Sequence, residues 1–158
     1  MLKVKAGMGI TAAATLAIAT PLIASWEGVR TIPYTDIAGV RTVCYGETND
    51  IEEREYTHEE CLALLREGVP DYYQFAMQQV DVDIPITMRA AITSFTYNVG
   101  PQAFKSSTML KKINRGDLWG ACDELDRWSY VGKMWVRGLN NRRKAERRLC
   151  IAELPADV

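Results

Sequence analysis

The sequence predicts an α+β fold that is mostly helical, with one small antiparallel hairpin toward its amino-terminal end. Apolar residues recur at helical spacing along much of the chain, and in one such stripe they are Met88, Ala91, Ile92 and Phe95. A turn signal at Ala38-Gly39 indicates a hairpin over 34–46. A chain of 158 residues fits one domain, with or without two lobes, and can bury a substantial core.

Residues 1–25 are typical of a weak membrane anchor. Lys3 and Lys5 precede the uncharged stretch 6–25, and a helix of that length spans about 30 Å, the thickness of a bilayer's hydrocarbon core. The two lysines would stay on the cytoplasmic side. The large apolar residues favour insertion by only about 2–4 kcal/mol in total; they are Met8, Ile10, Leu16, Ile18, Leu22 and Ile23. Glycine, threonine, proline and serine residues oppose insertion, so we expect it to be reversible.

Three interpretations of this segment compete. Ala17-Ile18-Ala19 offers the small residues of a signal-peptide cleavage site, although Pro21 lies just beyond them. A permanent anchor conflicts with the weak hydrophobicity. We favour a releasable anchor that is retained, contacts the inner membrane through residues 6–25, and packs as a helix against the domain after release.

The middle of the chain predicts helices with recognisable ends. The pattern Thr-His-Glu-Glu at 57–60 is a capping box, and it starts a helix that runs toward Gly68. We expect the Gly-Val-Pro sequence at 68–70 to bend or interrupt that helix, because proline removes a backbone donor. A further helix starts at Ile84-Pro85, carries the apolar stripe and ends at 98–100.

The last third predicts short helices followed by one longer helix. In chain order we expect a helix capped by Ser106 or Ser107 and ending near 114–116, a helix from Asp117 to Trp128, a short turn or helix at Met134-Trp135, and a final helix from Leu139 to Ile151. No internal repeat or low-complexity tract interrupts this order.

Glu27, Asp36 and Thr42 are the candidate catalytic residues. Glu27 precedes the hairpin, and the other two lie on it, nine and then six positions further along. Glycoside hydrolysis uses a protonated carboxyl that gives its proton to the leaving oxygen and a second carboxylate that activates water on the other face of the sugar. Thr42 would help to hold that water. Such a spacing also occurs by chance, so the three residues alone do not establish the site.

A glutamate that acts as a general acid needs a raised pKa, which an apolar wall provides most simply. Trp26, Val29 and Ile32 are the nearby candidates for such a wall around Glu27. We therefore expect one or more of these side chains to lie against the carboxyl group.

The surrounding residues resemble the active-site segment of phage-type lysozymes, glycoside hydrolase family 24. The motifs are E-G-V-R at 27–30, P-Y-x-D at 33–36, G-V-x-T-V at 39–43 and Y-G at 45–46. Motifs that resemble the family's second lobe and final helices follow in order: S-F-T-Y-N-V-G at 94–100, F-K-S-S-T at 104–108, K-I-N-R-G-D at 112–117, R-W at 127–128 and G-L-x-N-R-R at 138–143. The likeness is greatest to lambdoid-phage endolysins that carry a signal-anchor-release segment.

This resemblance implies a lysozyme-like fold in two lobes, with an anchor at 1–25 and a catalytic domain at 26–158. It implies that Glu27 is the general acid and that Asp36 and Thr42 complete the triad.

The resemblance also implies substrate-binding residues. Tyr34 and Asn98 match positions beside the substrate, and Arg142 matches an arginine near the catalytic glutamate. For Asn98, a helix C-cap is an equal alternative. Cys44 and Glu47 depart from the family pattern, which has glycine and histidine there in many members.

The implied function is that of a phage endolysin. It would be a muramidase that hydrolyses the β-1,4 bond between N-acetylmuramic acid and N-acetylglucosamine in peptidoglycan glycan strands, with inversion, and so lyses the host cell. We expect it to act as a monomer in the periplasm, after release from the host inner membrane, without metal or cofactor. Two alternatives stay open: a lytic transglycosylase, which needs one acid and leaves a 1,6-anhydro ring, and a wall-binding protein that no longer cuts.

Charge is unevenly distributed along the chain. The net charge of −1 argues against bulk binding of nucleic acid. Seven acidic residues lie within 47–60 and six basic residues within 137–148. We interpret both runs as solvated faces; the alternative is that the basic run faces an anionic polymer such as the cell wall.

The cysteines suggest disulfides rather than a metal site. Four cysteines allow three pairings, and an exported protein can form them. We expect Cys44 to pair with Cys61 and Cys122 with Cys150, with four buried thiols as the alternative. His58 is the only histidine and no C-x-x-C occurs, which argues against zinc and against Ser-His-Asp or Cys-His catalysis.

Overall fold

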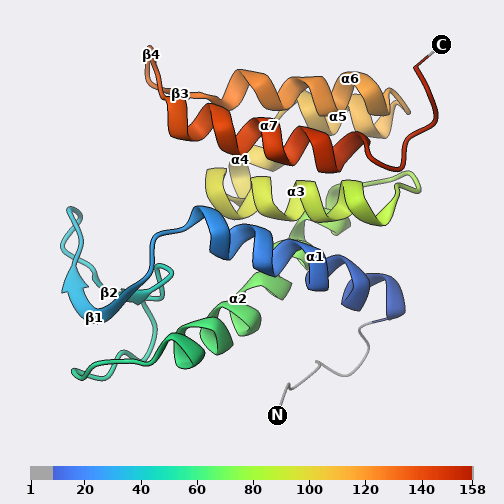
Figure 1. Cartoon of the computed structure of the whole chain (residues 1–158). Helices are drawn as coiled ribbons and strands as arrows, with labels where there is room; N and C mark the ends of the chain where they lie inside the picture. Colours follow the sequence, from blue (N-terminus) through green and yellow to red (C-terminus); the bar gives the residue numbers. More distant parts are fainter. Residues whose placement is uncertain (1–8, 158) are drawn as a thin grey trace.

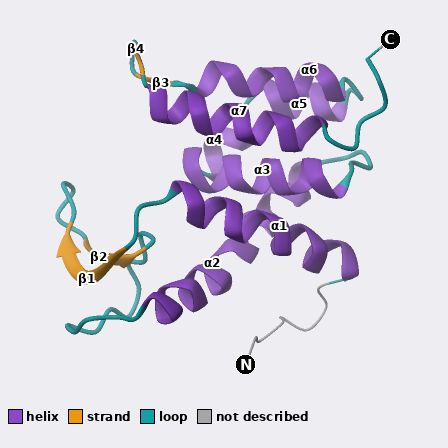
Figure 2. Ribbon diagram, in the orientation of Figure 1, coloured by secondary structure: helices purple, strands orange, loops and turns teal. Residues whose placement is uncertain are grey.

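The computed structural model describes residues 9–157 of the chain. Lys3, Lys5 and residues 6–8 of the predicted anchor lie outside the described residues, as does Val158. The described part is mostly helical and carries short antiparallel hairpins, which confirms the predicted α+β class (Figure 2).

Helix α1 spans Ile10–Trp26 and so contains most of the predicted anchor. It packs against α3 (Ile86–Val99) and α2 (His58–Gln79) (Figure 1). Its buried residues follow helical spacing, at Ala12, Thr15, the adjacent pair Ala19 and Thr20, and Ile23. Within residues 9–157, no helix combines the length and the apolar character needed to cross a bilayer.

Strands β1 (Arg30–Thr35) and β2 (Arg41–Cys44) form the predicted hairpin, which begins earlier than expected, at Arg30. The turn contains Gly39 at a φ of +80°, a conformation that residues with a Cβ rarely adopt. The hairpin projects from the helical body at the end where α1 stops (Figure 1). A small core of Val43, Cys44, Tyr56 and Cys61 joins it to the start of α2.

Helix α2 begins with the predicted capping box, since Thr57 and Glu60 each accept a hydrogen bond from the other's backbone N–H. The expected interruption at 68–70 is wrong, because α2 continues through Pro70 to Gln79. A proline inside a helix costs about 3 kcal/mol. Leu65 and Val69 are fully buried in a cluster with Ile23 of α1, and this packing offsets the cost.

Helix α3 is the centre of the molecule and contacts α1, α2 and α7 (Arg137–Ile151). Met88 and the unbroken run from Ala90 to Thr96 are buried in α3. Such continuous burial is expected for a helix that is covered on all sides. Gly100 is its C-cap, and a short helix that the sequence analysis did not predict, α4 (Pro101–Lys105), follows at once.

The carboxyl-terminal third follows the predicted order with two corrections. Ser107 caps α5 (Thr108–Asn114), and Asp117 caps α6 (Leu118–Asp123), which gives way to a 3₁₀ helix at Glu124–Trp128. The predicted turn or helix at Met134-Trp135 is wrong. These residues form strand β4, which pairs with β3 (Tyr130–Val131) across a Gly132-Lys133 turn of a kind that favours hairpins.

Both expected disulfides are confirmed. Cys44–Cys61 joins β2 to α2, and Cys122–Cys150 joins α6 to α7. The first bond lies in the hairpin lobe, formed by β1, β2 and the start of α2, and the second lies in the helical lobe, formed by α3 to α7.

Candidate active site

Glu27 lies where α1 ends, as the residue after the last helical one. Its backbone N–H still donates to the carbonyl of Ile23, 2.9 Å away, so the helix fixes the position of its Cα. Its side chain is 26% exposed, and Oε1 accepts a hydrogen bond of 2.7 Å from Nη1 of Arg142. Glu27 is therefore a partly exposed carboxylate with one oxygen fixed by a buried cation.

Asp36 and Thr42 lie on either side of the hairpin turn. Oδ1 of Asp36 accepts hydrogen bonds from the backbone N–H groups of Ala38 and Val40, at 2.9 and 2.8 Å. Thr42 is buried, and its hydroxyl donates to the carbonyl of Val40 at 3.0 Å. The two side chains thus share contacts with one peptide segment, and local hydrogen bonds hold both in place.

Tyr34 and Asn98, two of the predicted substrate-binding residues, each have a partner within the protein. Tyr34 pairs with Thr42 across the hairpin, and the guanidinium of Arg30 lies 4.2 Å from the centre of its ring. Asn98 lies in the last turn of α3 and accepts a hydrogen bond from Arg143. The helix C-cap is Gly100, so Asn98 does not have the capping role considered as an alternative.

Arg142 is 4% exposed and uses all three guanidinium nitrogens. Besides Glu27, it donates to Oε1 of Glu146 at 3.1 Å and to the carbonyl of Ser94 at 3.2 Å. Arg143 is fully buried and donates to the other oxygen of Glu146, also at 3.1 Å. The predicted solvated face is therefore wrong for Arg142 and Arg143, because α7 turns these two inward.

The three residues expected to form an apolar wall around Glu27 are exposed or packed elsewhere. Ile32 is 65% exposed and Trp26 36%, and Val29 packs against the small core of the hairpin lobe. The residue in contact with the Glu27 carboxylate is instead the cationic Arg142.

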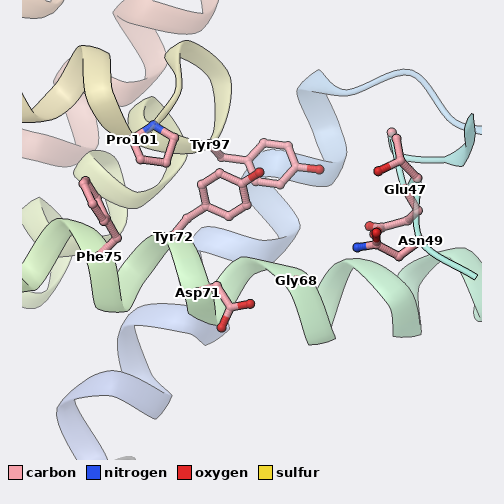
Figure 3. Close-up of a pocket in the computed structure, with 10 residues that line it drawn as sticks. Glu47, Asn49, Gly68, Asp71, Tyr72, Phe75, Tyr97 and Pro101 are labelled. Carbon is pink, nitrogen blue, oxygen red and sulfur yellow. The ribbon is translucent and has the colours of Figure 1, made fainter. Parts of the chain in front are cut away.

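A cavity of about 430 Å³ opens between the loop after β2, α2 and the end of α3 (Figure 3). Glu47 and Asn49 lie on one side of it, while Tyr72 and Tyr97 lie side by side across from them, with ring centres 4.8 Å apart. The hydroxyl of Tyr97 donates to the carbonyl of Tyr45 and so ties α3 to the hairpin lobe. The cavity has the aromatic and polar lining that suits a sugar.

Charges around the cavity link it to Glu27. Burial raises the pKa of Glu47, and the charge of Glu67 raises it further. Burial also raises the pKa of Tyr97, with the charges of Glu47 and Glu27 adding to the effect. Tyr97, which lines the cavity, is thus within electrostatic range of both glutamates.

The sequence analysis missed Glu146 and the ring pair Tyr72 and Tyr97. A signal for Glu146 was present, because it is the only acid in a basic run and lies three and four positions after two arginines. Within residues 9–157, the fold brings together no group of three or more His, Cys, Asp or Glu side chains that could hold a metal ion.

Comparison with known proteins gives consistent results. A family model described as phage lysozyme matches residues 24–146. The SAR-endolysin of Enterobacteria phage P21 is 49% identical over 127 residues, which cover 79% of this chain and 77% of that protein. The SAR-endolysin of Bacteriophage PS119 is 47% identical over 127 residues, covering 79% of this chain and 76% of that protein. The solved muramidase domain of SpmX from Asticaccaulis excentricus matches this structure with a TM-score of 0.78 at 28% sequence identity. The match covers 84% of this chain and 94% of the SpmX domain.

Proposed function

The chain belongs to the phage lysozyme family, and we propose that it cuts the β-1,4 bond between N-acetylmuramic acid and N-acetylglucosamine with Glu27 as the general acid. It is a phage endolysin, a glycoside hydrolase of the muramidase kind whose substrate is peptidoglycan. The observation that carries the residue assignment is the ion pair between Glu27 and Arg142, which holds one oxygen of a partly exposed carboxyl group.

In the acid step, Oε2 is the oxygen of Glu27 that would carry the proton. Arg142 contacts Oε1, whereas Oε2 has no hydrogen-bond partner among residues 9–157. With a proton on Oε2, Glu27 would donate it to the glycosidic oxygen as the bond to the sugar breaks. Arg142 would stabilise the carboxylate that remains.

Asp36 and Thr42 would then orient the attacking water on the opposite face of the sugar, which leads to inversion. Because Oδ1 of Asp36 is occupied by the turn, Oδ2 is the oxygen that would accept the proton of the water. The Thr42 hydroxyl donates to Val40 and keeps lone pairs that can accept from the same water.

The test is mass spectrometry of purified peptidoglycan after digestion by wild type, Glu27→Gln, and Glu55→Gln as a control at an exposed glutamate. Hydrated, reducing muramic-acid ends that disappear only with Glu27→Gln are the expected result. More than a tenth of wild-type activity in Glu27→Gln would overturn the role of Glu27.

Two other results would change the function itself. Anhydro ends would identify a lytic transglycosylase and leave Asp36 and Thr42 without the proposed role. No fragments from folded protein would identify a wall-binding protein.

We further propose that residues 1–25 are a releasable anchor, so that the protein is first held at the inner membrane and then acts as a monomer in the periplasm. The relatives named SAR-endolysin support this, and so does the position of Glu27 directly after α1. Docking of α1 on α3 would carry Glu27 to Arg142.

The anchor proposal is tested with Gly7→Leu/Gly9→Leu, which makes the segment more hydrophobic. A Cβ at Gly9 meets nothing within 4 Å, so the folded protein tolerates a side chain there. We expect the variant to stay in the membrane fraction and to leave peptidoglycan intact. Hydrolysis by the tethered variant at the wild-type rate would refute control by release.

A further inference from the structure

Glu146 is a buried carboxylate that bridges two buried arginines. It is 0% exposed and lies on α7, four positions after Arg142 and three after Arg143. Oε1 accepts from Nε of Arg142 and Oε2 from Nη1 of Arg143, each at 3.1 Å. The hydroxyl of Ser94 on α3 lies beside this pair, 3.5 Å from Nη2 of Arg142. Both oxygens are therefore used, and each one fixes a different guanidinium group.

Each of these arginines continues to a residue of the candidate active site. Arg142 reaches Glu27 at the end of α1, and Arg143 reaches Asn98 near the end of α3. The chain of contacts runs from Glu27 through Arg142, Glu146 and Arg143 to Asn98. Glu146 is the central link, and it touches neither end directly.

The geometry of arginine explains why Glu146 affects how the two arginines meet Glu27 and Asn98. The guanidinium group is a rigid plane, so a contact at Nε fixes the direction of the other two nitrogens. In Arg142, Glu146 holds Nε and Glu27 receives Nη1. Without the carboxylate, Nε of Arg142 would be free and the Ser94 carbonyl would be left to hold the far side of the guanidinium group. Its plane could then tilt, and the contact with Glu27 would lose its direction.

A second buried carboxylate shows what a purely structural bridge looks like. Glu124 is also nearly fully buried and contacts two cations, Lys112 at 2.7 Å and Arg127 at 3.2 Å. Neither cation touches a candidate site residue. The two glutamates share burial and charge compensation, and only Glu146 is connected to Glu27.

We propose that Glu146 is a positioning residue for the hydrolytic reaction: it holds Arg142 against Glu27 and Arg143 against Asn98. This inference rests on the proposed role of Glu27. Glu146 touches no substrate, and its effect on the reaction passes entirely through the two arginines.

Titration of Glu146 gives the proposal a distinctive readout. Burial raises the pKa of Glu146 to about 7, against the opposite effect of the two arginines and of Ser94. The charged groups facing it are Arg142 and Arg143 on α7, with Glu27 of α1 reached through Arg142. Below neutral pH the protonated carboxyl accepts less well from the arginines, so positioning should weaken as the pH falls through about 7.

The test compares Glu146→Gln with Glu124→Gln in the hydrolysis of soluble glycan strands, together with the melting temperature of each variant. Both substitutions remove a buried charge that compensates two cations, so both should lower the melting temperature. We expect kcat to fall about tenfold to a hundredfold in Glu146→Gln, because small misplacements of a catalytic group have effects of that size. Glu124→Gln should keep kcat within about twofold. The rise of wild-type kcat across pH 6–8 should disappear in Glu146→Gln.

Glu146→Asp covers the case in which Glu146→Gln fails to fold. It retains the negative charge but shortens the side chain by one methylene, so it cannot hold both arginines at once. Reduced kcat in folded Glu146→Asp would support the proposal, whereas unchanged kcat and an unchanged pH profile in either folded variant would overturn it. Glu27→Gln is measured in the same assay, so a failure of the proposed function is recognised separately by residual activity in that variant.

Discussion

The carboxylate of Asp36 has one oxygen committed to structure and one free for chemistry. Oδ1 accepts two backbone hydrogen bonds across the hairpin turn, from Ala38 and Val40. Among residues 9–157, Oδ2 has no hydrogen-bond partner. At the scale of a single residue, substitutions of Asp36 can therefore separate its role in holding the turn from its proposed role in activating water.

Asp36→Asn retains the Oδ1 acceptor and removes the charge, so we expect a folded protein with a near wild-type melting temperature and at least a hundredfold lower kcat. Asp36→Ala also removes the two hydrogen bonds, which costs about 1–3 kcal/mol of folding free energy. Thermal melts and initial rates on glycan strands measure the two effects. Equal kcat in wild type and Asp36→Asn would show that Asp36 serves the turn alone.

Glu47 gives a pH prediction at the same scale. Its pKa is raised in the folded protein, so the folded state binds more protons than the unfolded state between the two pKa values. Its contribution to stability is therefore fully present below about pH 4.3 and is lost as the pH rises through the folded pKa. Glu47→Gln removes this loss and should raise the melting temperature at pH 7 more than at pH 4.

Melts of Glu47→Gln at both pH values, with Glu67→Gln as the matched variant, test this account. Glu67→Gln removes one cause of the raised pKa and should give a smaller gain at pH 7 in the same direction. An identical change in the melting temperature of Glu47→Gln at pH 4 and pH 7 would contradict the raised pKa of Glu47.

The candidate site divides into a part that sequence could predict and a part that it could not. Glu27, Asp36 and Thr42 lie within sixteen consecutive positions, so their spacing and punctuation carry the signal. Arg142 and Glu27 are 115 positions apart and in contact. The spacing of Glu146 after Arg142 and Arg143 indicates ion pairs within the helix, but the sequence does not show whether those pairs face water or the core.

At the scale of helices and strands, local sequence signals predicted where helices begin better than whether a helix continues or a short strand forms. The capping box at 57–60 and the caps Ser107 and Asp117 depend on neighbouring residues only and are confirmed. The interruption of α2 at Pro70 is wrong because packing against α1 decides whether the helix continues. The pairing of β3 with β4 was missed because two-residue strands have too little periodicity to detect.

The two disulfides make an element-scale prediction. Their loops of 17 and 28 residues each correspond to about 3–4 kcal/mol of stabilisation in the chain-entropy description. Cys44→Ser/Cys61→Ser and Cys122→Ser/Cys150→Ser should lose comparable stability in urea unfolding. Only the first pair joins β2 to α2 beside the cavity, so it should also lower activity under conditions where both variants are folded. Equal activity in the two variants would show that the hairpin lobe keeps its position without the bond.

At the scale of the whole molecule, α1 combines two requirements in one sequence. It must be apolar enough to favour a bilayer and must also present one face to α2 and α3. Because residues 6–25 carry no charge, no polar face marks the solvent side, and the sequence could predict a helix but not its buried face. The structure assigns that face to residues that include Ala12, Ala19 and Ile23, and it places Glu27 one residue beyond the helix.

Matched substitutions on the two faces of α1 test whether its docking assembles the site. Ala19 is fully buried and Ala17 is exposed on the same helix. Ala19→Arg buries an unpaired charge in a packed interface, at a cost of about 3 kcal/mol or more, and should detach α1 from α3. Glu27 would then lose its contact with Arg142, and we expect activity to fall at least a hundredfold. Ala17→Arg adds the same side chain to the solvent face and should retain activity.

Near-ultraviolet circular dichroism separates detachment of α1 from general unfolding, because the edge-to-face contact of Phe95 with Trp128 belongs to a core cluster that contains no residue of α1. We expect this signal to persist in Ala19→Arg while proteases gain access to the chain around Glu27. Full activity in a variant whose α1 is demonstrably detached would mean that the acid reaches Arg142 without the helix. Loss of activity only when α1 detaches would mean that the anchor segment is itself a structural part of the active enzyme, and that release and assembly of the site are one event.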